Sequence, residues 1–145
     1  MEPVARDEDA CRVLIDQAAR HVRTASAGIG LGDSEGGLQL AYDACRKTCL
    51  ALILAIGLRP KDEQGSHAVT FEAAAAIAAN FGARDVVGDA GRLRYVRHGV
   101  EYRAGVVHHA DAEDAVSLAE ELLDSLSPQV TKLLDHPPPY RSRRA

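Results

Sequence analysis

The sequence predicts an all-α protein, an antiparallel bundle of four to six helices. Apolar residues recur at spacings of three and four, the period of an amphipathic helix, and no stretch shows the strict alternation of a strand. Stretches containing glycine and proline divide this pattern into segments. The length of 145 residues is that of one domain, which we expect at residues 7–135, between flexible termini at 1–6 and 136–145.

Six helical segments are expected. Asp33 or Ser34 can cap the second, Asp111 can cap the fifth, and Ser127 followed by Pro128 is expected to begin a short sixth. The second has an apolar face wide enough for a central position in the bundle. The expected ranges are 7–25, 35–58, 66 to 79 or 80, a fourth that begins between 84 and 89 and reaches about 107, 111–125, and a sixth from 127.

The stretch from Gly28 to Gly32 is expected to end the first helix. Its alternating glycines can suggest a phosphate-binding loop. No strand pattern precedes it, and no lysine followed by serine or threonine comes directly after it. We therefore interpret it as a turn.

Composition limits the possible functions. The net charge of −4 argues against a protein that coats nucleic acid by bulk charge, but it leaves room for a local basic patch. The apolar run 50–57 is too short to span a membrane. An odd number of cysteines and an N-terminus unlike a secretory leader predict a cytoplasmic protein. Cys45 and Cys49 share a helix face without further metal ligands at clear spacing, so we expect buried apolar residues there, with no metal site and no cofactor.

The most informative stretch is 91–109. On a helix, one continuous apolar stripe would consist of Leu93, Val96, Val100, Ala104 and Val107. A polar arc would border that stripe, formed by Arg94, Arg97, Glu101 and His108, with His98, Tyr102 and His109 next to it. This helix is expected to pack against the bundle through the apolar stripe and to present the polar groups along the adjacent side.

The polar arc has two interpretations. Arg97 and Glu101 are four residues apart and can form a solvent-exposed ion pair worth a few tenths of a kcal/mol, as in a plain helical scaffold. Alternatively, the groups can hold or cleave a phosphodiester. Arginine offers a planar fork for phosphate oxygens, histidine transfers protons near neutral pH, and Tyr102 can donate a hydrogen bond or stack on a base.

Further stretches carry a family resemblance: the run 41–47 in the second helix, the loop 57–60 leading to Gly65-Ser66-His67, and above all 93–102. Together with the helical order, they make the chain resemble the HEPN family (higher-eukaryote and prokaryote nucleotide-binding) over about 7–134. The resemblance implies a bundle of four or five helices that commonly forms a homodimer. Many members are metal-independent endoribonucleases of bacterial toxin–antitoxin and defence systems, in which paired signatures meet across the dimer cleft.

The resemblance also implies a catalytic set. Arg97 matches the signature arginine, His98 matches the polar residue after it, and Tyr102 stands at the spacing of the family's histidine. In metal-free cleavage the RNA 2′-hydroxyl attacks phosphorus, so a base and a charge-stabilising cation are needed. Arg97, helped by Arg94, suits the cationic role, and His98 or His108 suits proton transfer. Tyr102 is a poor base at neutral pH because its ordinary pKa is about 10.

The predicted RNA- or phosphate-binding residues are Arg94, Arg97, Glu101, Arg46 and Lys47. The expected partners are RNA or a nucleotide, a second copy of the chain, and an antitoxin or nucleotidyltransferase. The alternative is a non-catalytic helical dimer that binds a nucleotide, RNA or a partner protein. His67 is expected to cap a helix or lie on the surface, and the Pro-Pro-Pro-Tyr string at 137–140 is interpreted as a chance match to a WW-domain ligand.

Overall fold

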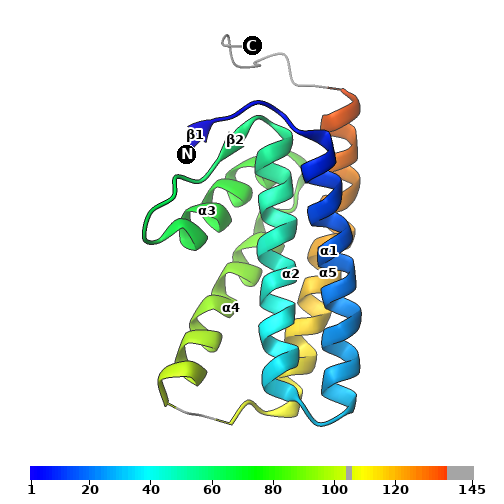
Figure 1. Cartoon of the computed structure of the whole chain (residues 1–145), viewed down its shortest axis with the longest axis vertical. Helices are drawn as coiled ribbons and strands as arrows, with labels where there is room; N and C mark the ends of the chain where they lie inside the picture. The colour runs from blue at the N-terminus through cyan, green and yellow to red at the C-terminus, as the bar shows by residue number, and fades with distance from the viewer. Residues whose placement is uncertain (104–105, 137–145) are drawn as a thin grey trace.

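The computed structural model of the chain describes the backbone of residues 1–103 and 106–136 and the side chains of residues 1–97 and 106–136. Within these residues, five α-helices make up most of the fold, so the all-α class is confirmed (Figure 1). A turn of 3₁₀ helix follows the third helix, and two short strands pair with each other. The elements are β1 (Glu2–Pro3), α1 (Glu8–Gly30), α2 (Ser34–Ala55), β2 (Leu58–Arg59), α3 (Ser66–Ala78), η1 (Ala79–Phe81), α4 (Arg84–Arg103) and α5 (His109–Asp135).

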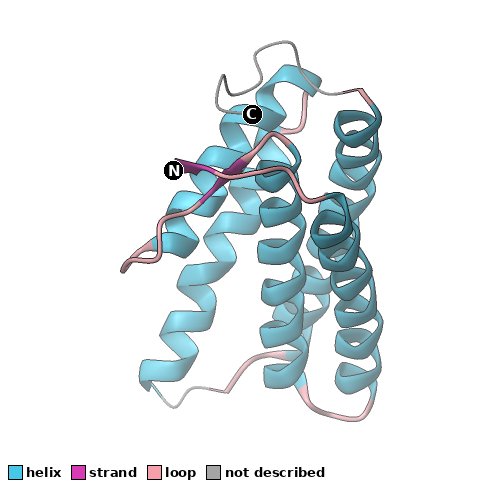
Figure 2. Cartoon of the chain, turned by 45° about the horizontal axis from the view of Figure 1, so that its top comes forward, coloured by secondary structure: helices cyan, strands magenta, loops and turns pink. Residues whose placement is uncertain are grey.

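Helix α2 lies at the centre of the bundle, as its wide apolar face predicts. It contacts α1 and α5 on one side and α3 and α4 on the other (Figures 1 and 2). The core is aliphatic and alanine-rich, and the central residues of α2 that are fully buried are Ala41, Tyr42, Cys45, Cys49, Ala51 and Leu52. Over the described part of the chain, no helix combines the length and the apolar character needed to cross a membrane.

Helix α1 continues past the glycines that were expected to end it. Gly28 and Gly30 are helical, and the chain turns only after them, where Gly32 adopts a φ of +91°. Ile29 is buried against α2 at Gly37, where an added Cβ would lie 2.4 Å from Ile29 Cγ1. Burial of Ile29 therefore extends the helix beyond the point that local glycine content indicates. Asp33 then caps α2, since its Oδ1 accepts a hydrogen bond of 2.9 Å from the Gly36 amide.

Helix α5 is one helix, and the expected break before Pro128 is wrong. Pro128 lies inside it. A buried stripe continues at spacings of four across the proline, through Leu122, Leu126, Val130 and Leu134. A proline in a helix removes one backbone hydrogen bond, and here the continuous apolar contact outweighs that loss.

The first six residues lie against the bundle. Glu2 and Pro3 pair antiparallel with Arg59 and Leu58, which forms a strand pair that the sequence did not predict. Arg6 Nη1 donates a 2.6 Å hydrogen bond to the Leu133 carbonyl near the end of α5. Residues 1–6, which were expected to be flexible, thus make contacts with positions far away in the sequence. The expected C-terminal tail, including 137–140, lies outside the described residues.

Candidate functional site

The inward face of α4 differs from the expected one. Val87 and Ala90 are fully buried, and the same helical face then carries Arg94 and Arg97, which are partly buried. Val96, assigned to the apolar stripe, is 44% exposed. The prediction that Val96 faces the core is therefore wrong. The side chains at 100 and 104, also assigned to this stripe, lie outside the described residues. The apolar periodicity predicted the wrong inward face for the second half of α4, because it could not show that Arg97 contacts Tyr42 and Gln39 of α2.

Arg97 contacts two side chains of α2, among its other interactions. Its guanidinium carbon lies 5.0 Å from the centre of the Tyr42 ring, a cation–π arrangement. Its Nε donates a hydrogen bond of 2.8 Å to Gln39 Oε1, one turn earlier on α2. Tyr42 itself is fully buried. The guanidinium is therefore oriented by groups from a helix other than its own.

His67 joins Tyr42 from the first turn of α3. Its Nδ1 lies 3.2 Å from the Tyr42 hydroxyl, and the two ring centres are 6.1 Å apart. Burial lowers the pKa of His67, and the nearby Arg46 and Arg97 lower it further. The imidazole is therefore neutral at pH 7. The cap position of α3 is Gly65, so His67 does not cap the helix, although its residue surface is exposed as expected.

The hydroxyl of Tyr42 can either donate or accept, which leaves His67 two tautomers. When Nδ1–H donates to the hydroxyl, Nε2 keeps its lone pair and can take a proton from a ligand. When the hydroxyl donates to Nδ1, Nε2–H can donate to a ligand oxygen. One tautomer can therefore accept a proton from a ligand hydroxyl, and the other can donate a hydrogen bond to a ligand oxygen.

Arg46 lies one turn after Tyr42 on α2. Its Nε is buried and, among the described residues, has no hydrogen-bond partner; the Asp43 Oδ1 is 3.8 Å away. A buried donor without a partner costs about 1–3 kcal/mol, so such an atom calls for an explanation such as a bound ion or ligand. We name Gln39, Tyr42, Arg46, His67 and Arg97 the Tyr42 cluster.

The potential in the Tyr42 cluster is positive. Burial raises the pKa of Tyr42, while Arg97, Arg46 and Arg94 act in the opposite direction. The same three arginines lower the pKa of His67, and Asp43 opposes them. Three guanidinium groups thus act on the site against one carboxylate, in a chain whose net charge is −4. This is the local basic patch that the composition allows.

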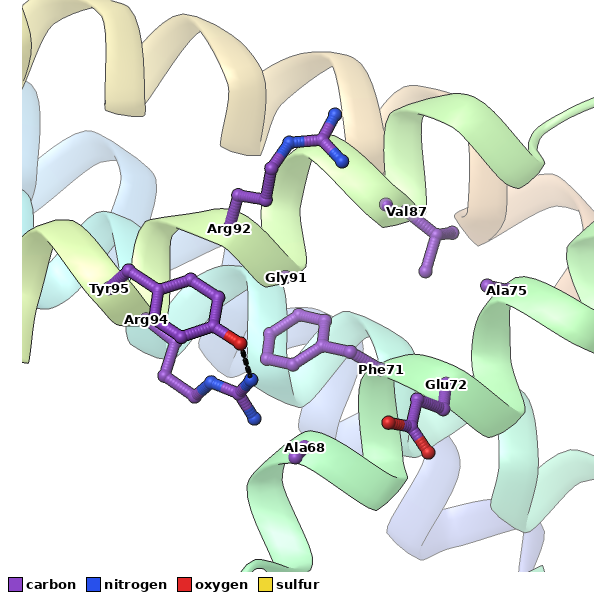
Figure 3. Close-up of a pocket in the computed structure, with 10 residues that line it drawn as sticks. Ala68, Phe71, Glu72, Ala75, Val87, Gly91, Arg92, Arg94 and Tyr95 are labelled. Atoms are coloured by element: carbon purple, nitrogen blue, oxygen red, sulfur yellow. Dashed lines mark hydrogen bonds between the residues drawn. The ribbon is translucent and has the colours of Figure 1, made fainter.

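Arg94 lies at the edge of this group. Its Nη2 donates a 2.6 Å hydrogen bond to the Tyr95 hydroxyl, and its guanidinium carbon lies 4.6 Å from the Tyr95 ring centre. Both residues line a cavity of about 210 Å³ between α3 and α4 (Figure 3). Arg94 therefore connects the Tyr42 cluster with that cavity.

Other predicted site residues lie elsewhere. Lys47 Nζ lies 2.8 Å from His21 Nε2 on α1, and burial, followed by the charge of Lys47, lowers the pKa of His21. Lys47 is therefore not brought to the Tyr42 cluster. His108 is the exposed N-cap residue of α5, and its neighbour His109 pairs with Glu113 at 2.9 Å. The side chains of His98, Glu101 and Tyr102 lie outside the described residues.

The cysteines are buried, as the sequence predicts. Burial raises the pKa of Cys11 to about 11 and that of Cys45 to about 12, and it raises the pKa of Cys49 well above its usual range. They are therefore protonated thiols that pack as small apolar groups. In the part of the chain that the structure describes, no three His, Cys, Asp or Glu side chains are grouped so that they could hold a metal ion.

The sequence reasoning missed Gln39 and Tyr42, and it did not connect His67 with Arg97. One available signal was the i, i+4 spacing of Tyr42 and Arg46, which places both on one face of α2. The cluster can bind an anion with two guanidinium groups and can exchange a proton through a neutral imidazole. No protein-family profile, no curated protein and no solved structure matches the chain, so this chemistry rests on the geometry of the site.

Proposed function

We propose that the chain is a HEPN-like protein that binds single-stranded RNA at the Tyr42 cluster, with Arg46 and Arg97 on the phosphates. The observation that carries the proposal is the buried Arg46 Nε without a hydrogen-bond partner in the described structure, one turn along α2 from Tyr42, on whose ring the Arg97 guanidinium is stacked. A phosphate oxygen would satisfy that donor. Arginine forks match phosphate geometry, and pre-oriented groups lose less conformational freedom on binding.

Two further observations favour RNA over a simple anion. Tyr95 is 65% exposed beside Arg94, so its ring is available for stacking on an unpaired base. The resemblance of residues 93–102 to the HEPN signature implies an RNA ligand as well. Since the net charge of the chain is −4, binding is expected at this local patch and not over the whole surface.

Salt-dependent RNA affinity tests this proposal. Fluorescence anisotropy with a labelled single-stranded RNA should give a dissociation constant that rises steeply between 50 and 200 mM salt. Arg97→Gln should weaken binding roughly 10- to 100-fold. It should also reduce the slope of log affinity against log salt concentration by about one. Arg23→Gln, an exposed arginine on α1, is the control with the same charge change. Equal effects of the two substitutions, or no RNA binding by the unaltered chain, would refute the proposal.

A metal-independent endoribonuclease is the second candidate, and the neutral His67 in a positive site favours it. In that reaction the 2′-oxygen bonds to phosphorus and the bond to the 5′-oxygen breaks, which leaves a 2′,3′-cyclic phosphate and a 5′-hydroxyl. A base takes the 2′-hydroxyl proton, and the leaving 5′-oxygen gains one. His98, His108 and His67 are therefore the three candidates for proton transfer. Arg97 suits stabilisation of the charged phosphorane.

Incubation with RNA in EDTA distinguishes the two candidates. Cleavage that yields cyclic phosphate ends and is lost in both Arg97→Ala and His67→Asn supports the nuclease. Cleavage lost in Arg97→Ala but retained in His67→Asn would return the proton-transfer role to His98 or His108. RNA binding without cleavage supports the non-catalytic alternative.

The oligomeric state belongs to the same proposal. The resemblance implies a symmetric dimer with the two Arg97 side chains near a shared cleft. Val96, on α4 next to Arg97, is 44% exposed and offers apolar surface for such a contact. Light scattering of the full chain tests it, with Val96→Lys as the disrupting variant. A role in a bacterial toxin–antitoxin or defence system, with an antitoxin or nucleotidyltransferase partner, stays a prediction.

A further inference from the structure

The cavity between α3 and α4 is separate from the phosphate contacts described above. It measures about 210 Å³. Its interior is apolar and its rim is charged and aromatic (Figure 3). The interior is lined by Ala68, Phe71, Ala75, Val87, Gly88 and Gly91. The rim consists of Glu72, Arg92, Arg94 and Tyr95.

Two glycines on α4 shape this cavity in different ways. At Gly91 an added Cβ would lie 3.3 Å from the Phe71 Cβ, so glycine there permits the close approach of α3 and α4. At Gly88 an added Cβ would meet only the tip of Arg92, at 3.8 Å. Packing therefore does not require glycine at this position, although glycine inside a helix lowers its stability. What glycine does provide at this position is open volume.

The rim has groups that recognise a flat, polar-edged ring. Tyr95 is 65% exposed and its ring is fixed by Arg94, so it offers an oriented face for stacking. Glu72, exposed on α3, can accept hydrogen bonds from ring N–H or exocyclic amino groups. Arg92, exposed on α4 and paired with Asp89, can donate to ring carbonyl oxygens.

The size of the cavity selects a small occupant. Pockets for drug-sized molecules measure roughly 300–1,000 Å³. A cavity of about 210 Å³ is smaller than this range and suits a single ring system.

The cavity borders the Tyr42 cluster. Phe71 lines the cavity, and its ring centre lies 5.9 Å from that of Tyr42. Ala68 follows His67 directly in α3, and Arg94 lines the cavity while lowering the pKa of His67. A base in the cavity and a phosphate on the Tyr42 cluster can therefore belong to the same or adjacent nucleotides.

We infer that this cavity is a nucleobase subsite that takes one unpaired base, which stacks on Tyr95 and whose exocyclic amino group donates to Glu72. The inference deepens the proposed RNA binding and rests on it for its biological meaning. Adenine and cytosine offer this exocyclic amino group, and uracil offers its ring N–H in its place.

Free nucleosides test the subsite without the phosphate contacts. Adenosine, cytidine and uridine are titrated into the ¹⁵N-labelled full chain, and amide shifts are followed by NMR. The amides of Ala68, Gly88 and Gly91 should shift with each of these three nucleosides. Gly88→Leu should remove these shifts, and Gly30→Leu, where an added Cβ meets nothing within 4 Å, should retain them. Absence of nucleoside-dependent shifts at the cavity in the unaltered chain would overturn the inference.

A second measurement separates this inference from the proposed function. Gly88→Leu and Tyr95→Ala should each weaken binding of a short oligoadenylate roughly 5- to 100-fold while leaving the affinity for an abasic oligonucleotide unchanged. If the affinities for both oligonucleotides fall equally, or if neither changes, the inference of a base subsite is wrong. Loss of abasic binding in Arg97→Gln alone would support the proposed function independently of the cavity. Circular dichroism of each variant establishes that it is folded.

Discussion

The guanidinium of Arg97 lies 5.0 Å from the centre of the buried Tyr42 ring, and the hydroxyl of the same tyrosine lies 3.2 Å from His67 Nδ1. One aromatic side chain on α2 thus contacts the side chains from α3 and α4 that can act on a phosphodiester. The ring supplies a stacking face for the cation and a hydrogen-bond partner for the imidazole. We regard Tyr42 as the residue that positions both.

Truncation of Tyr42 should therefore affect stability as well as the site. Tyr42→Ala removes a fully buried ring and should lower the free energy of unfolding by about 3–5 kcal/mol. Tyr95→Ala removes a 65% exposed ring and should change it by about 0.5 kcal/mol or less. Urea denaturation of both variants checks the pair. Equal losses would contradict the central position of Tyr42.

Stability should fall as the pH decreases below the ordinary histidine pKa of 6.5. Burial and nearby cations lower the pKa of His67 and of His21 in the folded chain, whereas the unfolded chain binds protons at the ordinary value. Below pH 6.5 the unfolded state therefore binds more protons than the folded state, so the free energy of unfolding rises with pH in this window. His67→Gln and His21→Gln should each flatten the dependence, and the double variant should flatten it more. Urea denaturation at pH 7.5, 6.5 and 5.5 gives the slopes; slopes that match the unaltered chain would refute the account.

An anion in the Tyr42 cluster should raise the pKa of His67. The negative charge favours the imidazolium and offsets the effect of Arg46 and Arg97. NMR titration of the His67 ring in increasing sulfate should show the midpoint moving upward, and the movement should be absent in Arg46→Gln/Arg97→Gln. A midpoint independent of sulfate would indicate that no anion enters the cluster.

The cysteines should resist thiol reagents in the folded state. Burial raises the pKa values of Cys11, Cys45 and Cys49, and only the thiolate reacts. At pH 8 a disulfide reagent should modify none of the three thiols in the native chain and all three in denaturant. Rapid modification of one thiol in the native chain would contradict its buried position.

The close approach of α1 and α2 depends on Gly37. An added Cβ there would lie 2.4 Å from Ile29 Cγ1, so Gly37→Ala should lower the free energy of unfolding by about 1–3 kcal/mol. At Gly30 an added Cβ meets nothing within 4 Å, and Gly30→Ala should cause no loss. Thermal unfolding of the two variants tests the difference. If Gly30→Ala lowers the free energy of unfolding as much as Gly37→Ala does, the close contact of α1 and α2 at Gly37 is contradicted.

The parts of the fold that depend on local pattern were predictable from the sequence. The helices, the cap at Asp33 and the central α2 follow from apolar spacing and from residues that satisfy helix ends. The continuation of α1 through Gly30 and of α5 through Pro128 was not predictable in the same way. Both depend on burial of Ile29, Leu126 and Val130 against other helices, and such contacts override local glycine and proline preferences.

The arginines of the Tyr42 cluster are among the residues that the sequence singled out, but their contacts with other helices were not predicted. The stretch 93–102 led to the prediction of Arg94 and Arg97 as site residues, and Arg46 was predicted from the run 41–47. The side chains that orient Arg97 are Gln39 and Tyr42, 58 and 55 residues earlier in the chain, and no local spacing connects them. The inward face of α4 was predicted wrongly at Val96 for a related reason. Apolar periodicity treats every arginine as a surface residue, whereas Arg97 is partly buried on the ring of Tyr42.

The most direct test of the central claim is a double-mutant cycle of Arg46→Gln and Arg97→Gln on the affinity for single-stranded RNA. If both guanidinium groups hold the same phosphate segment, the two losses should be non-additive by about 0.5 kcal/mol or more. The matched pair Arg20→Gln and Arg23→Gln, on the exposed face of α1, should cause small and additive changes. Additive losses at Arg46 and Arg97, or an unchanged affinity in the double variant, would contradict the account.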